Sequence, residues 1–229
     1  MYRTRKEWMG VLVSSLAMVL ATHCAKGATP ASEPGAPLAS SFPGPLWTVV
    51  APNGGTASVE NAHLMLTVPG GSNHDALIPS NQAVRVMQAI GNEDFDVSIK
   101  IDSPIVATAS GTSQGLMVLA DNQNFITFAL VTDGTNISLT AHKVSGGVAA
   151  TVLNIASFNE YHNPMCLRLT RTGNIYTAYY SVDGVVWTQA ASLVDTSVPT
   201  LIGPFAGNYN PAPANAVPVV MAIHWFNVL

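Results

Sequence analysis

The chain has 229 residues, of which 48% are hydrophobic and 10% charged, and its nine basic and thirteen acidic residues give a formal net charge of −4. This length is sufficient for one sizeable hydrophobic core. The scarcity of basic residues argues against nucleic acid and anionic lipid as partners, because both require a cationic surface.

The N-terminal 27 residues have the pattern of a secretory signal peptide. Three basic residues within the first six positions precede an apolar run over residues 9–21, which is too short to span a bilayer comfortably. Small residues favour cleavage before Ala28, and the alternative is lipidation of Cys24, whose surroundings depart from the usual lipobox. Cleavage would leave five basic and twelve acidic residues, a charge of −7. We expect a secreted, periplasmic or cell-surface protein with no membrane insertion after cleavage.

Residues 28–45 are rich in Pro, Ala, Ser and Gly, so we expect an extended linker that buries no core. The domain is predicted to cover residues 46–229, beginning where β-forming residues start at Trp47. Two cysteines occur in the whole chain, and Cys166 lies in an apolar stretch. Such a position indicates a buried thiol, and the sequence offers no disulfide framework.

Strand signals recur about every eight to twelve residues from Trp47 onward, with turn residues between them, as is typical of an antiparallel β-sandwich. The clearest alternation of apolar and polar residues runs over 94–102 and predicts a half-buried strand. Helical periodicity is nowhere sustained. Further strands are predicted over residues 63–68, 115–119, 124–131, 136–143, 148–154, 198–206 and 219–228.

The segment 168–187, RLTRTGNIYTAYYSVDGVVW, contains two turn signals inside a β-rich run. Thr172-Gly173-Asn174 and Asp183-Gly184 each suit a tight turn, which predicts three consecutive antiparallel strands. We expect these strands to form the centre of a sheet, with the third opened by Val185. In the second turn, Asp183 is expected to accept backbone N–H bonds while Trp187 packs beneath.

This segment resembles one found in bacterial concanavalin A-like (laminin-G-like) β-sandwich domains, some of which are appended to glycoside hydrolases. Other stretches match the same family in the same order: PGGSNHDA at 69–76, AVRVMQ at 83–88 followed by DFDVSIKID at 94–102, QGLMVLADNQNFITF at 114–128 and IGPFAGN at 202–208. The resemblance covers about residues 46–229. It implies an all-β, antiparallel two-sheet sandwich of the concanavalin A-like jelly-roll type.

Catalytic relatives of this fold that cleave β-glucans carry Glu-x-Asp-x-x-Glu or Glu-x-Asp-x-x-x-Glu along one strand. That spacing directs two carboxylates into a cleft, as nucleophile and general acid. The chain lacks both motifs, and the nearest stretch, residues 93–96, has the polar alternation of an ordinary exposed strand face. We therefore predict no catalytic residues.

The sequence does offer candidate ligand-binding residues. In similar domains a His-Asp pair follows Pro-Gly, and this chain keeps that pair after residues 69–71. Sugar hydroxyls are bound by fixed donors and acceptors, so we expect a set of polar side chains to converge on one face. The predicted set is His74, Asp75, Arg85, Gln88 and Gln114. The alternatives are structural: a loop cap by Asp75, a brace by His74, and an ion pair of Arg85 with Asp75 or Asp96.

No cofactor is predicted, and the identity of any metal is left open. The turns at 121–124 and 133–134 present oxygen atoms, so Ca²⁺ is a further candidate, although six or more ligands cannot be counted from the sequence. His224 lies within a predicted strand and is expected to be a core histidine rather than a ligand. Most aromatic residues are likewise expected in the core.

These features together favour a secreted, non-catalytic module that binds a glycan or polysaccharide, or that mediates surface interactions. One alternative is a glycoside hydrolase or polysaccharide lyase whose carboxylates converge only in three dimensions. Another is a structural protein of an envelope or extracellular filament that self-associates. It rests on the five basic residues left after cleavage, because few strands can then carry the lysines that protect sheet edges.

Overall fold

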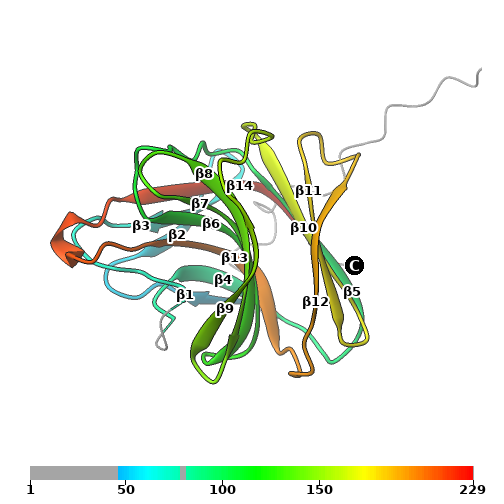
Figure 1. Cartoon of the computed structure of the whole chain (residues 1–229). Coiled ribbons are helices and arrows are strands. Elements are labelled where there is room, and N and C mark those ends of the chain that lie inside the picture. The colour runs from blue at the N-terminus through cyan, green and yellow to red at the C-terminus, as the bar shows by residue number, and fades with distance from the viewer. Residues whose placement is uncertain (1–45, 78–80, 229) are drawn as a thin grey trace, which may run out of the picture. The chain divides into compact units, whose positions relative to one another are not determined.

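Two antiparallel seven-stranded sheets pack face to face in the computed structural model, which describes residues 46–77 and 81–228 (Figure 1). The predicted all-β sandwich is therefore confirmed. The expected signal peptide and the expected linker both lie outside the described residues. None of the helices found among the described residues has the length and apolar character needed to cross a membrane.

The first sheet, called sheet A, has the strand order β1-β4-β13-β6-β7-β8-β9. Its strands are β1 (Trp47–Val50), β4 (Val84–Ala89), β13 (Leu201–Asn208), β6 (Thr112–Asp121), β7 (Asn124–Thr132), β8 (Ile137–Ser145) and β9 (Val148–Ile155). Consecutive hairpins join β6 to β9, whereas β13 inserts between β4 and β6 from far along the chain.

The second sheet, called sheet B, has the order β12-β11-β10-β5-β14-β3-β2. Its strands are β12 (Thr188–Val194), β11 (Ile175–Ser181), β10 (Met165–Thr172), β5 (Phe95–Ile101), β14 (Val219–Val228), β3 (His63–Val68) and β2 (Thr56–Glu60). The strands β10 to β12 form the predicted meander. The meander lies at one end of sheet B rather than at its centre, because β12 is an edge strand.

Alternation along the strands builds the core between the sheets. On β5, Val97, Ile99 and Ile101 are at most 1% exposed, while the polar residues between them are half-buried. On β6, Leu116 and Val118 belong to the same core. Since successive side chains point to opposite faces of a strand, this core fixes which residues reach the outer face of each sheet, the face turned away from the other sheet.

Sheet A also buries apolar residues on its outer face. On β6, Met117 and Leu119 belong to a second apolar cluster, apart from the core between the sheets. The cluster also contains Ala76, Ala83, Met87, Phe125, Ala129, Val144 and Phe205. Ala76 and Ala83 come from the segment that precedes β4, so this part of the chain covers part of the outer face of sheet A.

The second turn of the meander differs from its prediction in two respects. The third strand begins at Thr188 and not at Val185. Trp187 is only half-buried, whereas the side chain beneath the turn is Trp225, whose ring would lie 3.4 Å from a methyl group added at Gly184. The expected role of Asp183 is confirmed, because its Oδ1 accepts N–H bonds from Val185 and Val186 at 2.8 and 2.9 Å.

Candidate functional site

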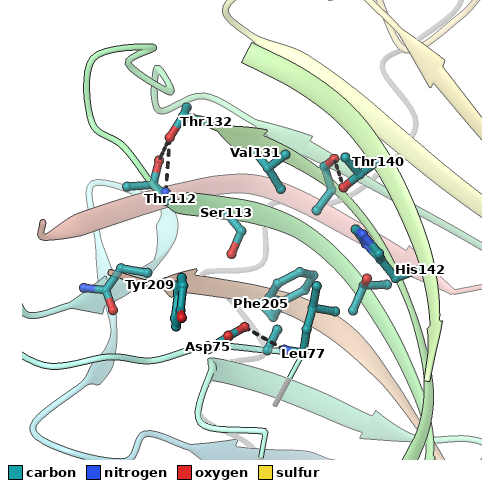
Figure 2. A pocket seen from close by; sticks show the side chains of 15 residues that line it. Asp75, Leu77, Thr112, Ser113, Val131, Thr132, Thr140, His142, Phe205 and Tyr209 are labelled. Atoms are coloured by element: carbon teal, nitrogen blue, oxygen red, sulfur yellow. Dashed lines mark hydrogen bonds between the residues drawn. The ribbon is translucent and has the colours of Figure 1, made fainter. Parts of the chain in front are cut away.

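A cavity of about 190 Å³ opens on the outer face of sheet A, beside the second apolar cluster (Figure 2). It lies where β6, β7, β8 and β13 run side by side and the segment leading to β4 crosses near them. The lining side chains are Asp75, Ala76, Leu77, Thr112, Ser113, Thr127, Ala129, Val131, Thr132, Thr140, His142, Phe205, Asn208 and Tyr209. Most of these are small, which is why the face stays hollow here.

Strand alternation explains why polar residues reach this cavity. On β8, Leu139 and Ala141 point into the core between the sheets, so Thr140 and His142 point outward. On β6, Ser113 lies two positions before Gly115 and therefore on the same face of the strand. A methyl group added at Gly115 would lie 2.2 Å from the carbonyl oxygen of Phe128. The missing side chain at Gly115 allows β6 and β7 to approach closely on the cavity side.

Several polar side chains around the cavity have no hydrogen-bond partner among the described residues. The groups concerned are the hydroxyls of Ser113, Thr127 and Tyr209 and the imidazole of His142. Burial lowers the pKa of His142, so its ring is neutral at neutral pH and offers one donor and one acceptor. Figure 2 shows Ser113, His142, Phe205 and Tyr209 around one common space. The cavity therefore combines unused polar groups with two aromatic rings.

Asp75 contributes the carboxylate of the cavity. Its Oδ1 accepts the N–H of Leu77 at 2.8 Å, as in an Asx turn, while Oδ2 makes no hydrogen bond with the described residues. Desolvation by burial raises the pKa of Asp75. The predicted capping role of Asp75 is thus present, and the second oxygen is still available to accept hydrogen bonds from a ligand.

His74 and Asn208 hold the segment that carries Asp75. The His74 side chain is fully buried, and its Nε2 lies 3.1 Å from the carbonyl oxygen of Pro52. Asn208 Oδ1 accepts the backbone N–H of His74 at 2.8 Å, and Asn208 Nδ2 donates to Pro69 and Val217 carbonyls at 3.0 and 2.7 Å. His74 therefore braces the loop from inside, as the structural alternative expected, and does not line the cavity.

Arg85 lies on the outer face of sheet A but outside the cavity. Its side chain is 4% exposed, and its Nη1 donates to the carbonyl oxygens of Asn81 and Ala83 at 2.8 and 3.2 Å. Its Nη2 donates to Asn122 Oδ1 at 3.1 Å. The alternative ion pair of Arg85 with Asp75 or Asp96 is not formed within the described residues, because Asp96 pairs with Arg168 and Asp75 caps the Leu77 N–H.

The two glutamines lie on the opposite side of the sheet from Arg85. Gln88 follows Val84 and Val86 at the strand period, and Gln114 precedes Leu116 and Val118 in the same way, so both point toward sheet B. Gln114 is 2% exposed and accepts the Ser103 hydroxyl at 3.3 Å. The five predicted residues therefore do not converge on one face, and of these five only Asp75 lines the cavity.

The turn carboxylates considered for Ca²⁺ are engaged within their own turns. Asp121 Oδ1 accepts the N–H groups of Gln123 and Asn124 at 2.7 and 2.8 Å. Asp133 Oδ1 accepts those of Thr135 and Asn136 at 2.8 and 2.7 Å. Hydrogen bonds from the Asn124 side chain and from these N–H groups lower the pKa of Asp121, and the bonds from Asn136 and Thr135 lower that of Asp133. A calcium site at either turn stays a prediction.

Comparison with known proteins establishes the fold alone. No protein-family model matches the chain, and no curated protein matches it significantly. Among solved structures, a GH43 protein from Bacillus licheniformis has a TM-score of 0.63 at 18% identity over 80% of this chain. A functionally unknown protein from Saccharomyces cerevisiae has a TM-score of 0.64 at 14% identity, and the match covers 80% of this chain and 94% of the yeast chain.

A third similar structure is described as the CBM2 module of the evolved Dit of Lactobacillus casei BL23 phage J-1. It has a TM-score of 0.52 at 12% identity, covering 76% of this chain and 80% of the module. The match to the Bacillus protein covers only 36% of that protein's length. The chain is therefore a β-sandwich similar to a segment of GH43 proteins.

Proposed function

We propose that this chain is an exported module that binds carbohydrate in the cavity on the outer face of sheet A. The observation that carries the proposal is the set of unused polar groups beside the rings of Phe205 and Tyr209. Sugars are bound by fixed hydroxyl, carboxylate and imidazole groups that orient the ring, together with an apolar surface that packs against its C–H face.

Each group has a definite part in this proposal. Asp75 Oδ2 accepts one sugar hydroxyl, which is a charge-assisted hydrogen bond and stronger than a neutral one. Ser113 and His142 supply donors and acceptors from the cavity floor, and Tyr209, which is 46% exposed, offers a ring face at the rim. The cavity volume of about 190 Å³ suits one sugar ring rather than a long enclosed chain.

We propose binding rather than cleavage because, among the residues that the structure describes, Asp75 is the only carboxylate that lines the cavity. Glycoside hydrolysis uses two carboxyl groups placed on either side of the scissile bond. The similarity to parts of GH43 proteins and to a CBM2 module supports a carbohydrate-related role of this domain, without indicating which sugar it binds.

A glycan array followed by calorimetry with the best ligand tests this proposal. Tyr209→Ala and Ser113→Ala should each weaken binding about tenfold or more, because each removes a group that contacts the sugar. Tyr179→Ala, a half-buried tyrosine on the outer face of sheet B, is the matched control and should bind normally. Loss of binding in Tyr179→Ala with normal binding in Tyr209→Ala would place the ligand on the other sheet and overturn the proposal.

Self-association through a sheet edge is a second candidate function. The edge strand β9 contains no charged residue, and it exposes 72% of Val148 and 37% of Val152. Long uncharged edges are templates for pairing with another strand. Light scattering on the wild type and Val152→Lys tests this function: a wild-type oligomer that becomes monomeric in the variant would support a structural role, and a wild-type monomer would exclude it.

A further inference from the structure

Two histidines and one aspartate meet on the outer face of sheet B, far from the cavity on sheet A. His63 Nε2 lies 2.8 Å from Asp102 Oδ2, and His224 Nδ1 lies 3.4 Å from the same oxygen. One ligand atom from each residue lies within 4.8 Å of the others. We propose that His63, Asp102 and His224 form a binding site for a divalent transition-metal ion.

The three side chains are positioned by neighbouring strands of sheet B. His63 begins β3, Asp102 directly follows β5, and His224 lies on β14, which pairs with both of the other strands. The register of β14 against β5 shifts between Ile223 and Trp225, so His224 occupies a bulge there. A bulge redirects a side chain, and here it places His224 beside Asp102 on the outer face.

The spacing of the ligand atoms is close to what a metal ion needs. Atoms bound to a tetrahedral ion by bonds of about 2.0–2.1 Å are about 3.3 Å apart. The separation of His224 Nδ1 from Asp102 Oδ2, 3.4 Å, already meets this value, and that of His63 Nε2, 2.8 Å, must open by about half an ångström. Small side-chain rotations at half-exposed residues can supply such a change.

A second hydrogen bond orients His63 in the manner of a metal ligand. Its Nδ1 lies 2.8 Å from the carbonyl oxygen of Asn61. A carbonyl oxygen only accepts, so Nδ1 carries the hydrogen and Nε2 is the nitrogen that can bind a metal. Metal-bound histidines commonly donate their other ring N–H to such a partner, which fixes the tautomer and the direction of the ring.

Asp102 supplies an independent indication of a missing partner. Its Oδ1 is buried and has no hydrogen bond with any described residue. A buried carboxylate oxygen without a partner is unfavourable, and such groups in native proteins commonly point to an ion or a water. A metal ion bound to Asp102 would compensate the negative charge of the carboxylate. The two histidines cannot do so while they are neutral.

The ligand set indicates the class of metal. Two imidazole nitrogens and one carboxylate oxygen suit Zn²⁺ and its first-row neighbours, whereas Ca²⁺ and Mg²⁺ prefer oxygen ligands alone. The side chains of His63, Asp102 and His224 are 24%, 28% and 33% exposed, so solvent reaches the site. Three protein ligands would leave one coordination position of a tetrahedral ion for water or for an atom of a partner.

Calorimetry with Zn²⁺ on the untagged full chain, freed of metal by a chelator, tests the proposal. We expect one equivalent of Zn²⁺ to bind and the melting temperature to rise, with no comparable rise for Ca²⁺. His63→Gln, His224→Gln and Asp102→Asn should each weaken Zn²⁺ binding at least tenfold. His162→Gln, at an exposed histidine elsewhere, is the matched control and should bind Zn²⁺ as the wild type does.

Two results would overturn the metal site. One is the absence of Zn²⁺ binding to the wild type at millimolar concentration. The other is equal binding by the wild type and by the three site variants, since Zn²⁺ would then be held elsewhere. Far-UV circular dichroism of each variant verifies folding, and Asp102→Asn conserves the side-chain shape if a histidine variant fails to fold. The site lies on sheet B, so this test is independent of glycan binding to sheet A.

Discussion

The two outer faces of the sandwich are built differently. The outer face of sheet A buries an apolar cluster beneath the segment before β4 and leaves a cavity beside it. The outer face of sheet B carries polar pairs, among them Arg168 with Asp96 and His63 with Asp102. A covered face excludes water and suits a neutral ligand, whereas a solvated face suits charge pairs and ions. One β-sandwich thus presents two chemically distinct surfaces.

On the outer face of sheet B, burial is expected to contribute most to stability where the 181–187 turn folds over Trp225. Trp225 is 1% exposed beneath this turn, so Trp225→Ala should lower the free energy of unfolding by about 3–5 kcal/mol. Trp187 is half-buried, with the Arg168 guanidinium 5.5 Å from its ring, and Trp187→Ala should cost only about 1–2 kcal/mol. Denaturant melts measure both, and equal losses would contradict the assignment of Trp225 as the buried residue.

The apolar cluster on sheet A should behave as a true core. Met117 is fully buried in it, so Met117→Ala is expected to cost about 2–5 kcal/mol, the usual loss for a large-to-small core change. Thr170→Ala, at a half-buried position of β10, is the control and should change stability by about 0.5 kcal/mol or less. A loss below about 1 kcal/mol for Met117→Ala would show that this face is loosely packed.

Close approach of two strands beside the cavity should make Gly115 intolerant of any side chain. A methyl group there would lie 2.2 Å from the Phe128 carbonyl oxygen and 2.6 Å from Ala129 Cα. Both are backbone atoms, so Gly115→Ala must shift β6 against β7, at a cost of about 1–3 kcal/mol. Gly173→Ala is the control for backbone strain. A methyl group at Gly173 would contact nothing within 4 Å, but Gly173 has φ +59°, so any loss of stability there reflects backbone strain at a turn and not a steric clash. An unchanged midpoint for Gly115→Ala would contradict the close approach.

The smallest expected effect concerns pH and the cavity carboxylate. Burial raises the pKa of Asp75 above its ordinary value of 3.8, so the native state binds this proton more tightly than the unfolded state. The contribution of Asp75 to stability is therefore favourable at low pH and is lost as pH rises through the native pKa. Asp75→Asn, whose Oδ1 can still accept the Leu77 N–H, should be slightly more stable than the wild type at neutral pH.

Denaturant melts of both proteins at a series of pH values check this prediction. The advantage of Asp75→Asn should shrink as pH falls toward 3.8, because the wild-type carboxyl group becomes neutral there. A stability difference that does not depend on pH would show that the Asp75 carboxylate is well solvated, and the outer face of sheet A would then resemble that of sheet B.

Local pattern was sufficient to predict most strands. The apolar and polar alternation of residues 94–102 predicted β5, and the turn signals at 172–174 and 183–184 predicted the order of β10, β11 and β12. These features depend on neighbouring residues only, since side-chain period and turn geometry act over a few positions. The same alternation on β8 could have assigned Thr140 and His142 to the outer face of their sheet.

Only the tertiary structure decided which distant residues meet. The cavity joins Asp75 to His142 and Tyr209, and the proposed metal site joins His63 to Asp102 and His224. Hydrogen-bonded ladders between strands remote in sequence create both groupings, such as β14 between β3 and β5. Arg85 and Gln88 illustrate the converse, which is that residues close in sequence can lie far apart in the fold. They are close in sequence, but their odd spacing directs them to opposite faces of sheet A, because the strand period is two.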